Sequence, residues 1–119
     1  MKTKSIPSLS KQLAQGVKDI KAWKAGKKKF RTHLVEKDGT RTTWMESGTE
    51  AKIRKQRLEQ FKAMRADLGL SQSEMAGALR VSTKTVQGWE IGNPIPASGF
   101  TMAELLHDLP AVRKRLLAA

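Results

Sequence analysis

The chain has 119 residues, enough for one domain or for one small domain with an extension. It carries 23 Lys and Arg against 11 Asp and Glu, for a formal net charge of +12, and it has no cysteine. This charge favours a polyanionic partner, nucleic acid ahead of a membrane surface, although a merely solvated basic surface has the same composition. The lack of cysteine excludes disulfides and thiolate metal sites, and without a membrane-spanning run or an apolar signal-peptide core we expect a cytoplasmic protein that is not membrane-bound.

The first periodic segment follows a polar stretch, residues 1–7, that we expect to be a disordered or short arm. Ser8 or Ser10 can cap a helix that runs to about Ala25 and ends at Gly26. One stripe of this helix is apolar, and its members are Leu9, Leu13, Val17, Ile20 and Trp23. We expect this apolar stripe to be buried, either against another part of this chain or against a partner.

The periodicity then changes to alternation, which predicts two strands at about residues 30–35 and 42–45. Phe30 and Leu34 share one face of the first strand, and residues 36–39 form a turn that contains Gly39. A lone two-stranded hairpin is marginal in water, so this one needs a neighbour to cover it. We therefore interpret residues 1–48 as an N-terminal module of one helix and one strand or hairpin.

Helical periodicity returns at Thr49, a candidate N-cap, and continues to Gly69. We expect this helix to be the first of a five-helix domain, residues 49–119, and its first turns to protrude toward the N-terminal module. The last two helices are expected from Phe100 or Thr101 to Leu109 and from Pro110 onward. Their apolar side chains serve either as core or as a dimer surface, and they are Leu105, Leu106, Leu109, Val112 and Leu116.

Between these segments, residues 70–92 predict two short helices joined by a tight turn. Ser71 and Glu74 form a capping box for the first helix, and Ser82 caps the second. Their apolar positions share one side, namely Met75, Ala76, Leu79, Val86 and Trp89. The pattern is typical of a helix-turn-helix, and the fold class that we expect is mainly α.

The same stretch, L-S-Q-x-x-M-A-x-x-L-x-V-S-x-x-T-V-x-x-W-E-x-G, resembles the Cro/C1-type (XRE) helix-turn-helix family. The resemblance implies an ion pair between Arg65 and Glu90 that ties the first helix of the domain to the end of the second helix of the motif. It also implies a homodimer on double-stranded operator DNA. Gly88 stands where some relatives place a base-contacting side chain, so readout there is expected to be lost or to move to Lys84 and Gln87.

The DNA-reading residues follow from the motif. The first turn of a recognition helix reaches base edges, and a preceding helix start can hold a phosphate. Lys84 is the candidate for reading bases, with contact to phosphate alone as the other interpretation, and Gln72 is the candidate for a phosphate contact. The whole candidate set is Gln72, Ser82, Thr83, Lys84, Thr85 and Gln87.

The wider layout, a helix, a strand-like segment and a helix-turn-helix that ends in LLHDLPAVRKRLLA, resembles HigA-type antitoxins. This resemblance implies a transcriptional repressor of its own operon that neutralises a RelE/HigB-like mRNA-cleaving toxin. The partner-binding candidates would be Leu9, Leu13, Val17, Ile20, Trp23, Phe30 and Leu34. The alternative is a stand-alone phage- or plasmid-type repressor whose basic N-terminal segment, including Lys27 to Lys29, is a second nucleic-acid contact.

We do not expect an enzyme, a metal site or a cofactor. The two histidines, His33 and His107, have no metal-ligand spacing to another candidate ligand, and no P-loop is present. A ribonuclease built from His33 with Lys29 and Arg31 is kept as a contrasting hypothesis, and it predicts RNA cleavage that His33→Ala abolishes.

Overall fold

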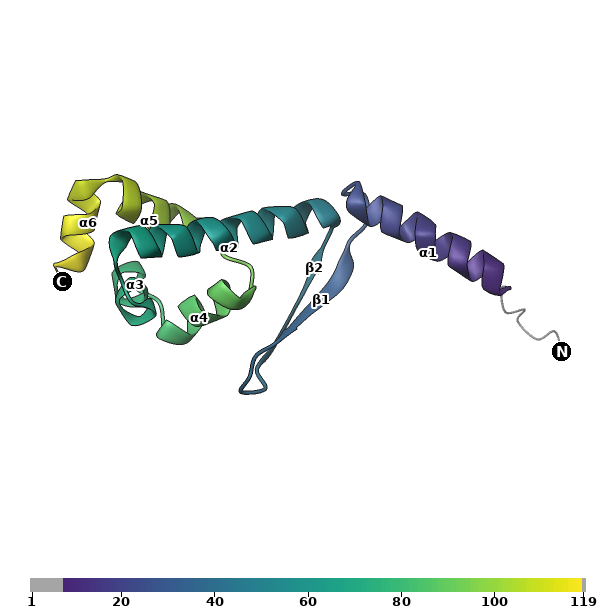
Figure 1. Ribbon diagram of the computed structural model, residues 1–119, viewed down its shortest axis with the longest axis horizontal. Helices are drawn as coiled ribbons and strands as arrows, with labels where there is room; N and C mark the ends of the chain where they lie inside the picture. Colours follow the sequence, from purple (N-terminus) through teal and green to yellow (C-terminus); the bar gives the residue numbers. More distant parts are fainter. Residues whose placement is uncertain (1–7, 119) are drawn as a thin grey trace.

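The computed structural model describes residues 8–118; the arm expected at residues 1–7 lies outside this range. Within it the chain is mainly helical, with a small antiparallel hairpin (Figure 1). The elements in order are α1 (Leu9–Lys24), β1 (Phe30–Val35), β2 (Arg41–Glu46), α2 (Gly48–Leu68), α3 (Gln72–Leu79), α4 (Thr83–Ile91), α5 (Ala97–Asp108) and α6 (Pro110–Leu117). No helix among these residues is both long and apolar enough to cross a membrane.

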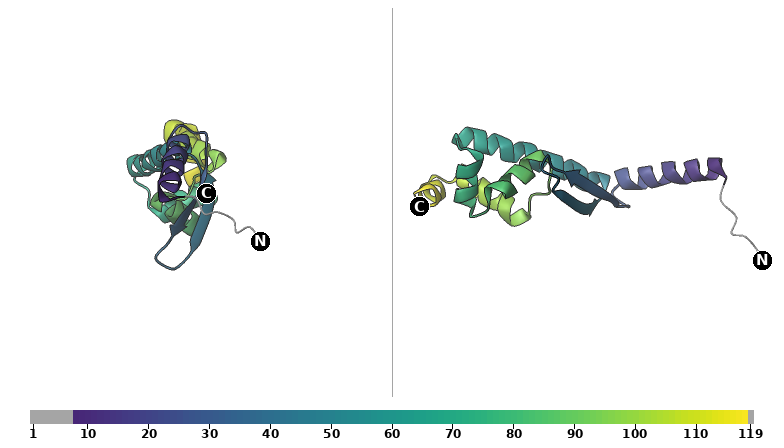
Figure 2. Two further views of the ribbon diagram at one scale, coloured as in Figure 1. Left: turned by 90° about the vertical axis from the view of Figure 1, so that its right-hand side faces the viewer. Right: turned by 90° about the horizontal axis from the view of Figure 1, so that it is seen from below.

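The core lies among α2 to α6. Phe61 of α2 is fully buried and meets the Trp89 ring of α4 edge-on, with 5.7 Å between the ring centroids. The other buried core side chains come mainly from α3, α4 and α5, and include Met75, Val86, Ala103 and Leu106. Figures 1 and 2 show that α3 and α4 lie on one side of α2. Helices α5 and α6 form the C-terminal part of the bundle. The expected five-helix arrangement of the second half is therefore present.

Helix α2 begins earlier than its predicted cap. Ser47, not Thr49, is the N-cap, and it forms a capping box with Glu50: the Glu50 amide donates to Ser47 Oγ at 3.2 Å, and the Ser47 amide donates to Glu50 Oε1 at 3.4 Å. A pair of side chains that satisfies two amide groups at once is a better cap than one threonine hydroxyl. The helix has 21 residues, and its first turns extend beyond the bundle as expected (Figure 1).

The C-terminal helices also differ in detail from the expectation. Helix α5 starts at Ala97 rather than at Phe100 or Thr101, because Pro96 supplies the extended N-cap conformation just before it. Pro110 opens α6 as expected. Leu106 is fully buried in the core, whereas Leu105 and Leu109 are 37% and 45% exposed. Of the leucines considered for a dimer surface, Leu106 therefore belongs to the core of the protomer.

The hairpin pairs β1 with β2 in the register Phe30 to Glu46 and Leu34 to Thr42. Gly39, at a φ of +89°, makes the turn, where a side chain would be strained. Thr32, Leu34, Thr42 and Trp44 alternate as half-buried positions, so one face of the hairpin is covered. Figure 1 shows the hairpin descending from the start of α2 toward the level of α4.

Helix α1 lies outside the bundle. Ser8 caps it, the Lys11 amide donating to Ser8 Oγ at 3.3 Å, and none of its residues is buried. Its C-terminal end meets the start of α2, while the rest projects away and gives the described chain a long axis of 73 Å against 30 and 20 Å (Figures 1 and 2). The helix expected at residues 8–25 therefore exists, but most of its apolar stripe is uncovered.

Candidate nucleic-acid interface

Helices α3 and α4 form a compact capped pair. The Glu74 amide donates to Ser71 Oγ at 3.1 Å, the Ser71 amide donates to Glu74 Oε1 at 3.1 Å, and the Thr85 amide donates to Ser82 Oγ at 3.1 Å. Arg80 ends α3 in the left-handed conformation, at a φ of 61°. At the start of each helix, local side chains thus accept hydrogen bonds from backbone N–H groups that have no partner within the helix. The polar residues that follow are then free to face outward.

An ion pair holds α4 against α2. Arg65 donates from Nε and Nη2 to the two carboxylate oxygens of Glu90, both at 2.8 Å, and from Nη1 to the Leu70 carbonyl at 3.0 Å. Only 5% of the Glu90 side chain is exposed, so a buried carboxylate and a guanidinium face each other at this point. The pair that the resemblance implied between Arg65 and Glu90 is present, and it fixes the C-terminal half of α4.

The candidate reading residues differ in how free they are. Lys84 and Gln87 are exposed on α4, and Gln72 is half-buried at the start of α3. The hydroxyl groups of Ser82 and Thr85 bond each other at 2.7 Å, so both are engaged in capping the helix. Lys84 and Gln87 are therefore the long polar side chains that α4 presents beyond its cap.

Lys84 has a partner that the sequence did not predict. Its Nζ donates to Asp38 Oδ2 at 3.0 Å and to Thr40 Oγ1 at 2.9 Å, both in the turn of the hairpin. Hydrogen bonds from the backbone and then the side chain of Thr40, followed by the bond from Lys84, lower the pKa of Asp38 to about 2. The hydrogen bond with Asp38 in turn raises the pKa of Lys84, so both groups are charged at neutral pH.

Gly88 is covered by the loop that follows α4. It is buried, and a Cβ there would lie 2.6 Å from Nδ2 of Asn93 in the loop after α4. A side chain at this position would displace the end of the Asn93 side chain. The expectation that readout is lost at Gly88 or moves to Lys84 and Gln87 stays a prediction, and both of these side chains are exposed.

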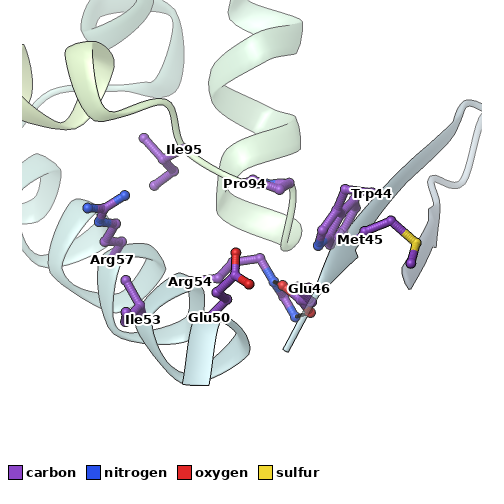
Figure 3. Close-up of a pocket in the computed structure, with 9 residues that line it drawn as sticks. All are labelled: Trp44, Met45, Glu46, Glu50, Ile53, Arg54, Arg57, Pro94 and Ile95. Carbon is purple, nitrogen blue, oxygen red and sulfur yellow. Dashed lines mark hydrogen bonds and ion pairs between the residues drawn. The ribbon is translucent and has the colours of Figure 1, made fainter. Parts of the chain in front are cut away.

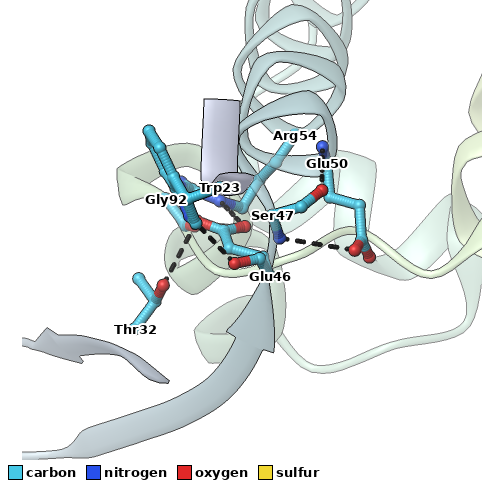
Figure 4. Close-up of polar contacts among 7 residues, drawn as sticks. All are labelled: Trp23, Thr32, Glu46, Ser47, Glu50, Arg54 and Gly92. Carbon is cyan, nitrogen blue, oxygen red and sulfur yellow. Dashed lines mark hydrogen bonds and ion pairs between the residues drawn. The ribbon is translucent and has the colours of Figure 1, made fainter. Parts of the chain in front are cut away.

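A second buried ion pair connects the hairpin to the bundle (Figure 4). Arg54 of α2 donates from Nε and Nη2 to the two oxygens of Glu46, both at 2.9 Å, and from Nη1 to the Gly92 carbonyl at 3.0 Å. Burial opposes ionisation of Glu46, but the hydrogen bonds from Arg54 outweigh it and lower the pKa of this carboxyl. The base of the hairpin, the start of α2 and the C-terminal end of α4 therefore meet at one guanidinium.

Sequence reasoning missed this contact. Glu46 ends a β-strand, where side chains alternate between two faces, whereas Arg54 lies on an α-helix with about 3.6 residues per turn. No sequence spacing therefore predicts that these two side chains meet. A groove of about 410 Å³ beside the pair lies between β2, α2 and the loop after α4 (Figure 3). Its walls include Ile53, Arg57 and Ile95. The hairpin is thus attached to the bundle rather than separated from it at residue 48.

The partner-binding candidates fall into two groups. The stripe of α1 is open, with Leu9 71%, Leu13 62%, Val17 52% and Ile20 50% exposed. Trp23, in contrast, is half-buried and donates from Nε1 to the Glu46 carbonyl at 3.0 Å. Leu34 lies against Gly92, and Phe30, 37% exposed, lies beneath the Lys28 ammonium. Trp23 and Leu34 thus pack against the chain itself and leave the stripe from Leu9 to Ile20 as the unpartnered surface.

A basic concavity lies where α1 meets α2. It measures about 410 Å³, and its lining contains Trp23 with the lysines Lys24, Lys52 and Lys55. The neighbouring lysines are already paired: Lys28 Nζ lies 2.8 Å from Asp19, and Lys29 Nζ lies 3.1 Å from Glu50. These two ion pairs leave Lys27, together with the lysines of α1 and α2, as the positive charge of this junction.

The two histidines lie far apart in the fold. His33, on an exposed hairpin position, bonds the Thr43 hydroxyl at 3.0 Å. His107 of α5 lies 3.1 Å from Asp67 and 2.7 Å from Asp108. Within residues 8–118 no three acidic, histidine or cysteine side chains are placed to hold a metal ion. In the ribonuclease hypothesis, Lys29 would act together with His33 and Arg31. The Nζ of Lys29 lies 3.1 Å from Glu50, so this cation is already paired.

Comparisons with known proteins give no relative: no family model, no curated protein and no solved structure matches this chain.

Proposed function

We propose that this protein is a sequence-specific DNA-binding transcriptional repressor with a Cro/C1-type helix-turn-helix formed by α3 and α4. One observation carries the proposal: α4 is locked from behind by the pair Arg65–Glu90 while Lys84 and Gln87 stand exposed on its outer side. A rigid helix with long polar side chains on its outer face and a capped start is what reading base edges in a major groove requires. The net charge of +12 supplies the attraction to phosphates.

The repressor is proposed to act as a homodimer, because one such motif touches too few base pairs for useful specificity. Leu105, Leu109 and Leu117 are 37–45% exposed near the C-terminal end of the bundle and support a dimer surface there. Two half-sites about 34 Å apart on one face of the DNA would follow.

The DNA-binding proposal is tested by selecting bound duplexes from a random library and measuring the affinity of the selected site and its single-base variants. Lys84→Ala should relax the preference at one base pair per half-site, because a good base contact is worth about 1–3 kcal/mol of discrimination. Gln72→Ala should weaken binding to all sequences alike, as removal of a phosphate contact does. A Lys84→Ala protein with an unchanged sequence ranking would make Lys84 a phosphate contact only.

The regulator is further proposed to be an antitoxin whose α1 binds a RelE/HigB-like toxin. The support is the open stripe on α1, since an apolar face at the end of a projecting helix is a surface that a partner can cover. The test is coexpression with the product of the adjacent gene. The double variant Leu13→Asp, Val17→Asp should abolish the complex and leave operator affinity unchanged. Persistence of the complex would remove α1 from the interface.

The basic concavity at the junction favours a second candidate, in which the N-terminal module is an additional nucleic-acid contact of a stand-alone repressor. Replacing Lys52 and Lys55 by Gln distinguishes the two. Under this candidate the affinity for DNA falls uniformly across sequences, and its salt dependence becomes shallower by about one unit of slope for each phosphate that the variant no longer neutralises. Under the antitoxin proposal the DNA affinity and its salt slope stay close to those of the parent.

A further inference from the structure

The side chain of Lys84 joins the first turn of α4 to the turn of the hairpin. Two hydrogen bonds from Lys84 Nζ, to Asp38 and to Thr40, join elements that are more than forty residues apart in the chain. A surface depression of about 370 Å³ runs along this contact, and its lining includes Asp38, Lys84 and Gln87. The two exposed long side chains of α4 therefore share their surface with a carboxylate from another element.

Hydrogen bonds within the hairpin turn hold Asp38 in place. Its Oδ1 accepts from the Thr40 amide at 2.9 Å, which leaves Oδ2 for Lys84. The turn is closed by the Glu36 amide donating to the Thr40 carbonyl at 2.8 Å and by the Gly39 amide donating to the Glu36 carbonyl at 2.9 Å. The carboxylate is thus held in one orientation, aimed at α4.

The hairpin is also fixed at its other end. Arg54 joins Glu46, the last residue of β2, to the carbonyl of Gly92 directly after α4. Leu34 packs against Gly92. One end of the hairpin is therefore attached beside the C-terminal end of α4 and its turn beside the N-terminal end, so the hairpin lies alongside this helix as a fixed part of the same surface.

The hydrogen-bonding capacity left at this pair matches one kind of base pair. Lys84 has three N–H donors, two of which are used by Asp38 and Thr40, so one remains. An ionised carboxylate has about four acceptor positions, and the Thr40 amide, the Thr40 side chain and Lys84 occupy three. Side by side, the pair offers one donor and at least one acceptor.

A G·C pair presents guanine N7 and O6 as adjacent acceptors in the major groove and, next to them, the cytosine N4 amino group as a donor. We propose that Lys84 and Asp38 read one G·C pair per half-site together, the ammonium on guanine and the carboxylate on the cytosine amino group. An A·T pair places an amino group where guanine has O6, so the ammonium would be without that acceptor and would meet a donor. This inference rests on the proposed DNA-binding function and adds the hairpin turn to the reading surface.

The experiment uses the full chain and the duplex selected by the parent protein. Lys84→Ala identifies the base pair that Lys84 reads, as the position at which the preference disappears. That position should be G·C, and Asp38→Asn should reduce the preference at the same position by about tenfold or more, since one good base contact is worth that much. Because a negative charge is removed, Asp38→Asn should also bind all sequences somewhat more tightly.

Glu36→Gln is the matched control. Glu36 acts on Lys84 through its charge without a hydrogen bond to it, so the variant should tighten overall binding while it keeps the ranking of the single-base variants. Asp38→Glu, which retains the carboxylate, should recover part of the preference, and the melting temperature of each variant checks that the fold is retained.

Three results would overturn the inference: an unchanged ranking in Asp38→Asn, an equal reduction of preference in Glu36→Gln, or a Lys84-dependent position that is not G·C. Each of these leaves DNA binding itself in place. If the parent protein selects no duplex at all, the proposed function fails instead.

Discussion

Two arginine-carboxylate pairs hold the fold together, one within the bundle and one between the bundle and the hairpin, and both carboxylates are nearly buried. Glu46 and Glu90 side chains are 6% and 5% exposed, and each accepts two hydrogen bonds from one guanidinium. Such bidentate pairs are directional, so they fix orientation as well as distance. Arg54 and Arg65 also each donate to a backbone carbonyl, of Gly92 and Leu70, which leaves few of their donors unused.

We predict that Glu90→Gln destabilises the protein by about 3 kcal/mol, because removing one charge of a buried pair leaves the other without compensation. For a bundle of this size the change should lower the melting temperature by about 10–20 °C in thermal unfolding followed by circular dichroism. Glu59→Gln, at an exposed position of the same α2 helix that Arg65 belongs to, should change the stability by no more than about 0.5 kcal/mol. Equal melting temperatures for the two variants would mean that the pair contributes nothing to stability.

Three ion pairs show what a sequence can disclose at the level of residues. Arg65–Glu90 is expected from a family resemblance, since both residues belong to a recurrent motif. Arg54–Glu46 and Lys84–Asp38 are not, because each joins the hairpin to a helix, and neither propensity nor periodicity says where a hairpin docks. The sequence therefore places the candidate reading residues on the right helix but does not disclose the turn beside them.

At the level of elements, local signals predict the helices and strands well. The caps Ser71 and Ser82 and the stop at Gly92 can all be located from the sequence, since each acts through its own neighbouring backbone. The starts of α2 and α5 differ from the expected positions by two to four residues. In both cases more than one nearby residue can serve as a start, and the capping box at Ser47 and the conformation of Pro96 decide between them.

A histidine joins two elements of the bundle and makes one contact dependent on pH. His107 of α5 bonds Asp67 near the end of α2, and its hydrogen bonds to the carboxylates of Asp108 and then Asp67 raise its pKa. A raised pKa in the folded state means that the stabilisation is complete below the unfolded value, near 6.5, and disappears as the pH rises through the folded value.

We therefore predict that His107→Gln destabilises the protein at about pH 5.5 and that the difference from the parent shrinks by about pH 8.5. Urea unfolding at both pH values measures it. His33→Gln serves as the control, because His33 bonds a hydroxyl group and no carboxylate in the described structure. A difference between parent and His107→Gln that is the same at both pH values would show that the charge of the imidazolium contributes nothing.

The molecule as a whole has two parts that differ in how many contacts hold them to the rest of the chain. The core and the buried pair Arg65–Glu90 hold the bundle together, and the buried pair Arg54–Glu46 joins the hairpin to it. Helix α1, in contrast, contacts them at its C-terminal end through Trp23 and leaves its leucines exposed. A helix of 16 residues is marginal in water when packing does not support it. Composition and periodicity indicate that α1 is a helix, but they do not indicate whether the rest of the chain covers its apolar stripe.

Two glycines test this difference because their surroundings match. Gly16 lies in the middle of α1 and Gly77 in α3, and an added Cβ would meet nothing within 4 Å at either. Replacing a helical glycine by alanine favours the helix by up to about 1 kcal/mol. We predict that Gly77→Ala raises the melting temperature of the cooperative transition by about 4–8 °C. Gly16→Ala should instead increase the helical circular dichroism signal of the native protein without moving that transition, since α1 frays independently of the bundle. If both substitutions raised the melting temperature equally, α1 would unfold together with the bundle, and its junction with α2 would be a rigid connection rather than an attachment at one end.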